Sequence, residues 1–468
     1  MSATSAKPSM TLRETAFRLS GRLQMAVGGS GETAWHGVST DTRTVSKDEL
    51  FVALRGENFD AHDFVHVAAA QGACAALVSR PVDVAIPQIV VGDTMWAYGQ
   101  LAQYWRSRFS VPTVAITGSN GKTTVKEMLR AIMVAHTGDA NAVLATEGNL
   151  NNNIGVPRML LRLNAAHRIA VLEMGMNHLH EIDYLSRLAV PDAALIIMAG
   201  TAHIGELGSR EAIAQAKGEI YAGLRDDGIA CVNVDDRFAD YWLALIGNDN
   251  RRRIVSFGTH PRAVVRGELA GHGLRLHIDG AREDVNLLVA GQHNQRNAIA
   301  AAAGAHALGI PLATIASGLR SFAGVPGRLR TYRGHKGATI IDDTYNANPD
   351  SMRAAIAVLA ASTDNKVLVL GDMGELGDDA AAMHAEIGQE AKRAGIDTLL
   401  ATGELAREYV RAFGAGATHA ADIDALNALV TAKLSPQTTV LVKGSRFMRM
   451  ERVVAALVEP SAQDLRGH

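Results

Sequence analysis

A short apolar strand that runs into a glycine-rich loop and then into a helix constrains this chain more than any other feature. The segment reads Thr113-Val-Ala-Ile-Thr-Gly-Ser-Asn-Gly-Lys-Thr-Thr124. In such a turn, the backbone N–H groups of the loop and of the helix N-terminus converge on one place and bind phosphate oxygens. The sequence therefore predicts a nucleotide site. Its candidate contacts are Gly118, Ser119, Asn120, Gly121, Lys122, Thr123 and Thr124.

Two side chains of this loop carry the expected chemistry. Lys122 would reach the β- and γ-phosphates, and the Thr123 hydroxyl would ligate Mg²⁺. The longer form of the motif has a glycine five positions before its second glycine, where this chain has Ile116, so the shorter Thr-Gly-x-x-Gly-Lys-Thr form applies. The alternative is a plain strand-to-helix turn with a solvated lysine. The order of strand, loop and helix favours the nucleotide site.

Most of the chain alternates short apolar runs with alanine-rich amphipathic stretches, which is the pattern of βα units around a mostly parallel sheet. A length of 468 residues suits three domains. We predict an α/β fold with a central P-loop ATPase-like parallel sheet and domains at 1–111, 112–323 and 324–468. The segment 253–289 changes to alternating, turn-punctuated runs and predicts a small antiparallel insertion.

Charge and cysteine usage exclude several classes of protein. The net charge of −2 marks neither a nucleic-acid binder nor a membrane-surface binder. Two cysteines, Cys74 and Cys231, cannot build a disulfide framework or a thiolate metal site. The start of the chain has no apolar stretch of a signal peptide, and no window reaches the ~18 apolar residues of a membrane span. We therefore expect a cytoplasmic protein without nucleic-acid partners or membrane insertion.

Polar residues also follow two other buried strands. Glu173 ends the run 169–172, and His203 lies in the loop after the run 193–198. Ligands of open parallel sheets bind beyond the carboxyl ends of the strands. If these strands neighbour the phosphate-loop strand, both side chains face the γ-phosphate and are candidate Mg²⁺ ligands beside Thr123. Taken alone, Glu173 or His203 is more often a helix cap or a hydrogen-bonded loop residue. Lys217, on the next helix, is expected from the sequence alone to be a solvated surface lysine.

Taken together, these residues resemble the murein (Mur) ligases, the ATP-dependent amide-forming enzymes of peptidoglycan-precursor synthesis. The resemblance runs over nearly the whole chain. It implies a first domain for the UDP-sugar peptide, a central ATPase domain and a C-terminal Rossmann-like domain that presents the incoming amine. Glu173 and His203 match the magnesium ligands of the family. Lys217 matches a lysine that the family carbamylates with CO₂ to help hold a second Mg²⁺. Such a reaction needs a neutral amine, and burial near cations lowers a lysine pKa.

The resemblance assigns further residues around ATP. Asn294, in the segment Gly291-Gln-His-Asn294, is implied to lie next to the adenine, and it also reads as a helix N-cap. Arg328 is implied to meet the γ-phosphate from the domain junction, and Asp343 to complete the ATP site from the C-terminal sheet. The implied catalytic residues are Lys122, Glu173, His203, Lys217 and Arg328. The implied metal ligands, for two Mg²⁺ ions, are Thr123, Glu173, His203 and Lys217.

Two groups of residues are implied to bind the other substrates. The runs 38–43 and 51–64 and the loop 149–157 would hold the UDP-sugar peptide. The residues for that end are Thr40, Asp41, Arg43, Gly56, Asp60, His62 and Asn152. The residues for the amine are Tyr345, Asn348, Lys443, Ser445 and Arg446.

The C-terminal motifs separate the branches of the family. Tyr345-Asn-Ala-Asn-Pro349 and Val442-Lys-Gly-Ser-Arg446 resemble the branch that adds D-alanyl-D-alanine to UDP-N-acetylmuramoyl-tripeptide through an acyl phosphate. The N-terminal runs are shared with the sister branch that adds a diamino acid or lysine, but its Asp-Asn-Pro-Arg segment is missing. A folylpolyglutamate-synthase-like ligase is a further alternative, but that function would give the N-terminal domain no role. A non-enzymatic nucleotide-binding regulator is the remaining alternative. We expect a monomer.

Overall fold

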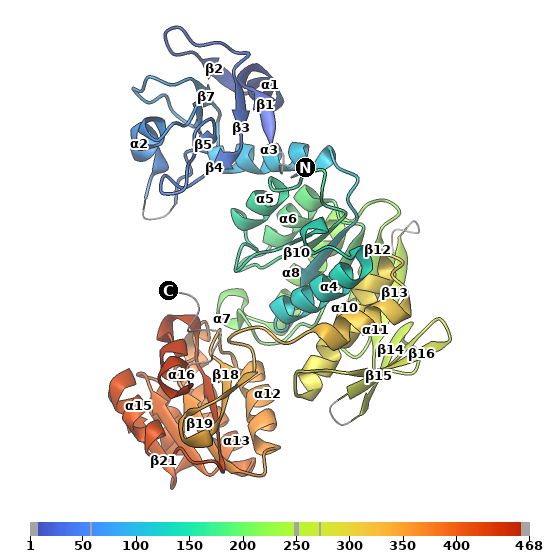
Figure 1. Cartoon of the computed structure of the whole chain (residues 1–468), viewed down its shortest axis with the longest axis vertical. Coiled ribbons are helices and arrows are strands. Elements are labelled where there is room, and N and C mark those ends of the chain that lie inside the picture. The colour runs from blue at the N-terminus through green and yellow to red at the C-terminus, as the bar shows by residue number, and fades with distance from the viewer. Residues whose placement is uncertain (1–7, 57–58, 248–251, 271–272, 460–468) are drawn as a thin grey trace.

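The computed structural model of the chain describes residues 8–56, 59–247, 252–270 and 273–459. Three α/β bodies follow one another along the long axis of the molecule, with the N-terminal body at one end and the C-terminal body at the other (Figure 1). Residues 1–7, on which the prediction about a signal peptide partly rests, lie outside the described residues. No helix within the described ranges is long and apolar enough to cross a membrane.

The N-terminal body holds a mostly parallel five-stranded sheet beside a two-stranded antiparallel one. Strand β5 is short and fully buried, in keeping with its apolar sequence Leu-Phe-Val. In sheet order the five strands are β2 (Arg22–Gln24), β7 (Gln88–Val90), β6 (Ala75–Val78), β5 (Leu50–Val52) and β4 (Val38–Ser39). The other elements are β1 (Ser9–Thr11), β3 (Ala34–His36), α1 (Leu12–Arg18), η1 (Ala61–Phe64) and α2 (Val65–Ala70).

Helix α3 (Thr94–Ser107) joins this body to the central one. Its indole at Trp105 donates to the Leu163 carbonyl at 2.9 Å, and the Arg106 guanidinium donates to the Ala189 carbonyl at 3.1 Å. Both bonds are buried, so the C-terminal half of the helix is fixed to the central body.

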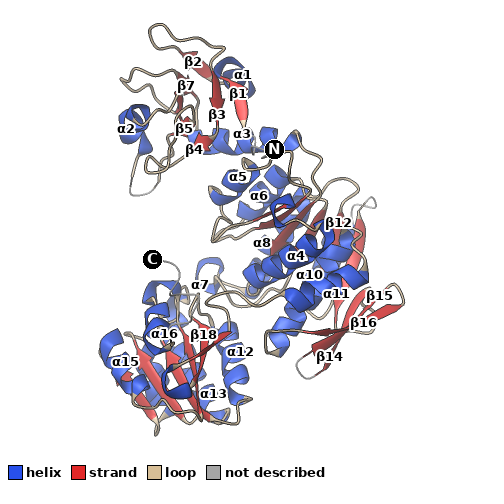
Figure 2. Cartoon of the chain, in the orientation of Figure 1, coloured by secondary structure: helices blue, strands red, loops and turns tan. Residues whose placement is uncertain are grey.

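A nine-stranded sheet forms the central body, and the phosphate-loop strand β8 lies between β10 and β11. All five residues of β8 are buried, because helices cover both faces of the sheet (Figure 2). In sheet order the strands are β16 (Ala281–Asn286), β15 (Gly273–Ile278), β14 (Val265–Ala270), β13 (Arg253–Gly258), β12 (Ile229–Asn233), β11 (Ala193–Ile196), β8 (Thr113–Thr117), β10 (Ile169–Glu173) and β9 (Val143–Ala145).

The helices divide the apolar residues of this body into two cores, one on each face of the sheet. Helices α4 and α10 share one core, and the alanines of α10 let it lie close to the strands. The elements are α4 (Lys122–Thr137), η2 (Ala140–Ala142), α5 (Gly155–Leu160), α6 (Glu181–Ala189), α7 (Ile204–Leu207), α8 (Arg210–Gly218), η3 (Glu219–Gly223), α9 (Ala239–Gly247), α10 (Gln292–Ala307) and α11 (Leu312–Ser321).

The predicted antiparallel insertion at 253–289 is wrong in part. Strands β13 and β14 extend the parallel sheet, and the antiparallel pairs are β14 with β15 and β15 with β16. The alternation that suggested a separate insertion has another cause: one face of these strands packs in the core with α10, and the other faces solvent.

The C-terminal body is a six-stranded sheet with an apolar core on each face. It is parallel except for β17, so the predicted α/β fold with a Rossmann-like C-terminal domain is confirmed. Its strands are β17 (Arg330–Arg333), β18 (Thr339–Asp343), β22 (Thr438–Lys443), β19 (Asn365–Leu370), β20 (Thr398–Thr402) and β21 (Ala417–Ala420). Its helices are η4 (His335–Gly337), α12 (Pro349–Ala360), η5 (Gly377–Asp379), α13 (Ala380–Arg393), α14 (Ala406–Phe413), α15 (Ile423–Thr431), η6 (Arg446–Met448) and α16 (Glu451–Leu457).

Candidate active site

The glycine loop between β8 and α4 has the backbone that phosphate binding requires. Gly121 takes the N-cap position of α4 with a left-handed φ of 82°, and a Cβ atom there would collide with the Asn297 side chain. A side chain is therefore excluded at Gly121 on both conformational and steric grounds. The helix has no side-chain cap, so its first N–H groups are left for an anion.

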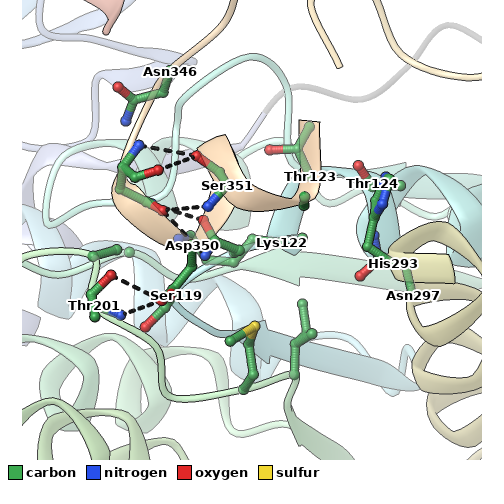
Figure 3. A pocket seen from close by; sticks show the side chains of 18 of the residues that line it. Ser119, Lys122, Thr123, Thr124, Thr201, His293, Asn297, Asn346, Asp350 and Ser351 are labelled. Carbon is green, nitrogen blue, oxygen red and sulfur yellow. Dashed lines mark hydrogen bonds between the residues drawn. The ribbon is translucent and has the colours of Figure 1, made fainter. Parts of the chain in front are cut away.

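One large pocket of about 1550 Å³ opens over this loop. Its walls come from the phosphate loop, the ends of the central strands, the start of α10 and the facing edge of the C-terminal body (Figure 3). Most of the predicted site residues line it together, although they are spread over more than 320 positions of the chain. They are Ser119, Asn120, Gly121, Lys122, Thr123, Thr124, Asn152, Glu173, His203, Asn294, Arg328, Asp343, Tyr345, Asn348, Lys443, Ser445 and Arg446.

Thr123 lies at the centre of a buried polar network. Its hydroxyl donates to Oε2 of Glu173 at 2.9 Å and accepts from Nη2 of Arg328 at 2.8 Å. The second oxygen of Glu173 accepts from the amide of Asn151 at 2.9 Å. Strand β10 pairs with β8 in parallel, which brings Glu173 to the edge of the sheet where the phosphate loop begins. The neighbourhood expected from the strand ends is therefore present.

Lys122 lies in the same pocket, with its ammonium folded back onto the loop. Its Nζ donates to the Gly118 carbonyl at 2.7 Å. Burial lowers the pKa of Lys122, and the nearby Glu173 carboxylate opposes that shift. A phosphate oxygen in the loop would take over the hydrogen bond that the carbonyl now accepts, as the predicted role of Lys122 requires.

His203 contacts the C-terminal body. Its Nδ1 lies 3.0 Å from Oε2 of Glu375, which is an ion-pair distance. Both residues have left-handed backbones, with φ of 65° at His203 and 60° at Glu375. This backbone conformation is strained for residues other than glycine. The surrounding structure must therefore stabilise the contact between His203 and Glu375.

The donor set fits Mg²⁺ bound jointly with phosphate. Within the described ranges, no three His, Cys, Asp or Glu side chains lie close enough to form a metal cluster by themselves. Mg²⁺ in nucleotide sites needs only one or two protein oxygens, because phosphates and waters complete its octahedron. The Thr123 hydroxyl and the Glu173 carboxylate, already 2.9 Å apart, are oxygen donors of that kind.

Lys217 is fully buried in α8 and does not line the large pocket. No ion pair or hydrogen bond of its ammonium is found among the residues that the structure describes. Burial, and secondarily the charge of Lys122, place the pKa of Lys217 well below its usual value. The solvated lysine expected from the sequence alone is therefore wrong, since the side chain is held where the neutral amine is favoured.

Asn294 and His293 line the pocket from the first turn of α10. Gly291 is the N-cap of α10, so the N-cap reading of Asn294 is wrong; its side chain instead donates back to the Ala290 carbonyl at 2.7 Å. Burial lowers the pKa of His293 to about 4, so its imidazole is neutral at physiological pH. The sequence pointed to Asn294 as the contact and passed over His293.

The sequence analysis also missed the wall formed by the ends of β12 and β13. Asp235 there accepts from the backbone N–H of Thr259 at 2.6 Å, from its hydroxyl at 2.8 Å and from the N–H of His260 at 3.1 Å. All three residues line the pocket. The strand Ile229–Asn233 was not predicted, and the polar residues at its end therefore drew no attention.

Several residues assigned to the amine are already bonded within the protein. Nζ of Lys443 donates to Oδ2 of Asp343 at 2.6 Å and to the Asn346 carbonyl at 2.8 Å. Asn348 caps α12, and Ser445 accepts from the Gly374 N–H at 2.7 Å. Two others keep side chains on the wall. The guanidinium of Arg328 stacks over the Tyr345 ring at 4.1 Å, and Arg446 is largely exposed, 3.4 Å from Glu451.

The buried Lys443–Asp343 pair gives a prediction about stability. Burial raises the pKa of Asp343, and the Lys443 charge opposes that shift. Lys443→Met should lower the free energy of unfolding by about 3–5 kcal/mol, because it leaves a carboxylate buried and uncompensated. Chemical denaturation measures this, with the exposed Lys433→Met as control. The double variant with Asp343→Asn should recover part of the loss. A loss as small as that of the control would show that the pair is not needed.

The residues predicted for the UDP end lie apart from the large pocket, except for Asn152. Arg43 holds Asp41 in a two-pronged ion pair at 2.6 Å and lowers the pKa of Asp41 to about 2. Both ring nitrogens of His62 are engaged, one with Asp60 at 2.5 Å and the other with the Ser79 N–H at 2.9 Å. Six of these residues lie in the N-terminal body: Thr40, Asp41, Arg43, Gly56, Asp60 and His62.

A smaller hollow of about 270 Å³ extends the large pocket toward that body. The two hollows share Asn153 and Glu181. Trp96 and Tyr184, with ring centroids 5.9 Å apart, form part of the wall of the smaller one. The smaller hollow therefore adjoins the large pocket at these two residues and reaches the start of α3.

Comparisons with known proteins agree on the whole chain. Three family models match it in succession: "Mur ligase family, catalytic domain" at 34–108, "Mur ligase middle domain" at 116–305 and "Mur ligase, glutamate ligase domain" at 327–446. The chain is 42% identical to UDP-N-acetylmuramoyl-tripeptide–D-alanyl-D-alanine ligase of Escherichia coli (strain K12), over 96% of this chain and 99% of that relative.

Solved structures give the same picture. A crystal structure of MurF from Acinetobacter baumannii superposes with a TM-score of 0.89 at 37% identity, covering 96% of this chain and 99% of that one. MurF ligase from Thermotoga maritima, solved in complex with ADP, superposes with a TM-score of 0.77 at 26% identity, covering 90% and 96%.

Proposed function

Because the chain belongs to the Mur ligase family, we infer that it is the ATP-dependent ligase that adds D-alanyl-D-alanine to UDP-N-acetylmuramoyl-tripeptide in peptidoglycan-precursor synthesis. The observation that carries this function is the convergence of the phosphate loop, Glu173 and the C-terminal strand ends on one pocket. Relatives that are 42%, 38% and 36% identical to this chain are named for these two substrates, which favours this branch over the sister ligases and the folylpolyglutamate synthases.

We propose that the first half-reaction forms an acyl phosphate over the phosphate loop. The terminal carboxylate of the tripeptide attacks the γ-phosphorus of ATP, a P–O bond forms, and ADP leaves with the electrons of the broken bond. Lys122 and Arg328, both in the pocket, stabilise the charge that spreads over the phosphate oxygens. Bound magnesium would neutralise part of that charge, and Thr123 and Glu173, with His203, are the residues proposed to hold it.

The second half-reaction forms the amide. The amino group of D-alanyl-D-alanine attacks the acyl carbon, a tetrahedral intermediate forms, and phosphate leaves as the amine loses a proton. The C-terminal body supplies the facing wall, on which Tyr345 and Arg446 are the residues still available to the dipeptide. A closed pocket at this stage excludes water and so protects the acyl phosphate from hydrolysis.

The remaining roles are part of the same proposal. Lys217, buried and favoured as a neutral amine, adds CO₂ to become a carbamate that helps hold a second Mg²⁺. Asn294 contacts the adenine, and Asp343 supports the nucleotide from the C-terminal sheet. The residues in the N-terminal body hold the UDP end, and the hollow beside Asn153 lies on the way from there to the phosphate loop. We keep a monomer as part of this proposal.

The test measures phosphate release with purified UDP-muramoyl tripeptide and ATP while candidate amines are supplied one at a time. D-alanyl-D-alanine should raise the rate well above the amine-free background. Release that responds instead to a diamino acid or lysine, with the shorter UDP-dipeptide, would identify a sister ligase. Glutamate with a folate would identify the third kind of ligase. ATP binding without any amine-dependent release would identify a regulator.

A further inference from the structure

The first turn of α12 reaches out of the C-terminal body into the nucleotide pocket. Asp350 is the second residue of this helix, and its Oδ2 accepts from the backbone N–H of Thr201 at 2.8 Å and from the Thr201 hydroxyl at 2.9 Å. Figure 3 shows both bonds. Thr201 belongs to the central body and stands in the loop between β11 and α7. One carboxylate therefore joins two bodies of the molecule beside the phosphate loop.

The loop that Asp350 holds is itself bonded to the phosphate loop. The N–H of Gly200 donates to the Ser119 hydroxyl at 2.9 Å, and the N–H of Ser119 donates to the Met198 carbonyl at 2.9 Å. A Cβ atom on Gly200 would lie 2.5 Å from Oδ2 of Asp350, so a side chain at this position would displace the carboxylate. Thr201 is therefore linked to Ser119 through Gly200, so a shift of Thr201 should also move Ser119.

A neighbouring contact joins the same helix turn to the phosphate loop directly. Nδ2 of Asn348 donates to Oδ1 of Asn120 at 2.9 Å. At the other end of the loop that contains Thr201, Glu375 of the C-terminal body approaches His203 at 3.0 Å. The C-terminal body therefore contacts the ATP-binding loops at several points, which include Arg328 on Thr123, Asn348 on Asn120 and Asp350 on Thr201.

Two simpler roles do not explain Asp350. Helix α12 does not need it as a cap, because Asn348 and Ser351 already form a complete capping box. It is also unsuited to bind phosphate, since a carboxylate repels an anion. Its Oδ2 accepts two hydrogen bonds and its Oδ1 lies 3.5 Å from Arg353, so both oxygens have partners in the protein.

We propose that Asp350 is a positioning residue for the ATP-dependent half-reaction, although it belongs to the body that delivers the amine. It holds the loop around Thr201, and through it Ser119, in the geometry that receives the nucleotide phosphates. The consequence is an order built into the fold: ATP is bound well only when the C-terminal body is docked, so the acyl phosphate forms in a pocket that is already covered. The proposal rests on the proposed function only for the identity of the amine.

The test uses the full-length protein and ADP with Mg²⁺ as the probe in titration calorimetry. Asp350→Ala should weaken ADP binding by about tenfold to a hundredfold, the scale of losing two hydrogen bonds to a carboxylate. Asp350→Asn should bind ADP almost as the parent does, because its amide oxygen can accept both bonds. Thr201→Val removes one bond and should give a smaller effect, and adding it to Asp350→Ala should cost little more.

Asp424→Ala is the matched control. Asp424 holds the same second position of α15 in the same body and is exposed, so its replacement should leave ADP affinity unchanged. In phosphate-release assays, Asp350→Ala should raise the KM for ATP and leave the KM for D-alanyl-D-alanine unchanged. If Asp350→Ala fails to fold, Thr201→Val alone decides the question.

Three results would overturn the proposal. The first is unchanged ADP affinity in Asp350→Ala, or in Thr201→Val where that variant decides. The second is an Asp350→Asn variant as weak as Asp350→Ala, because the charge rather than the hydrogen bonds would then matter. The third is a rise in the KM of the dipeptide alone. Failure of the proposed function has a different signature, since the parent protein would release no phosphate in response to D-alanyl-D-alanine while the ADP titrations would still be decisive.

Discussion

Lys122→Ala is expected to lower kcat by at least ~10²–10³-fold, the scale of removing one preorganised group that stabilises charge in a transition state. The ammonium lies inside the pocket, 2.7 Å from the Gly118 carbonyl, at the turn where the phosphate loop begins. Transfer of the γ-phosphoryl group spreads negative charge over the phosphate oxygens. Lys122 is the one cationic side chain of the loop that can stabilise this charge. Steady-state phosphate release with saturating substrates measures the effect.

The control for this variant is Lys433→Ala, an exposed lysine of the C-terminal body whose loss should leave kcat unchanged. Lys122→Ala should still fold, because alanine suits the first position of α4 and the change removes the side-chain hydrogen bond to the Gly118 carbonyl without adding bulk. A decrease in kcat of less than about tenfold would contradict the role assigned to Lys122. A large decrease in the control would mean that the assay reports stability instead of chemistry.

The central part of the site could be predicted because each of its signals is local. The phosphate loop is a contiguous motif, and Glu173 directly ends a run of apolar residues that could only be a buried strand. In parallel sheets such strand ends meet at one edge, so short-range patterns were enough to bring Thr123 and Glu173 together. The structure has them 2.9 Å apart.

The parts that were missed depend on packing between segments far apart in the sequence. Asp350 and Thr201 are separated by 149 positions and lie in different bodies, and neither stands in a motif that suggests the other. Asn348 and Lys443, which follow strands of the C-terminal sheet, were assigned to the amine through the family resemblance, yet in the folded chain one caps α12 and the other neutralises Asp343. A strand-end rule finds the right edge of a sheet, but it does not separate residues that bind a ligand from residues that build its wall.

Lys217 shows the same limit most sharply. The sequence alone predicts that Lys217 is an ordinary solvated cation on a helix surface. The tertiary structure instead buries it near Lys122. A buried ammonium with no counter-charge is unfavourable, so the residue must lose its proton or gain a negative group. The proposed carbamylation would achieve the second, since the new group is anionic and would remove the repulsion that a lysine exerts on Mg²⁺. The burial itself is therefore the physical argument for the modification.

Lys217→Met is accordingly expected to lower kcat by about 10²-fold or more, on the scale of losing one charged group of the transition-state environment. Methionine keeps most of the apolar stem, so the variant should be as stable as the parent in denaturant unfolding. Lys217→Ala should lose as much activity and leave space for a small acid. Acetate or propionate should therefore restore part of its rate and none of the rate of Lys217→Met. In the parent, ¹³C-bicarbonate should give a carbamate NMR signal that both variants lack. A parent without that signal, or a Lys217→Met variant with nearly full activity, would leave Lys217 a buried neutral amine with no part in the chemistry.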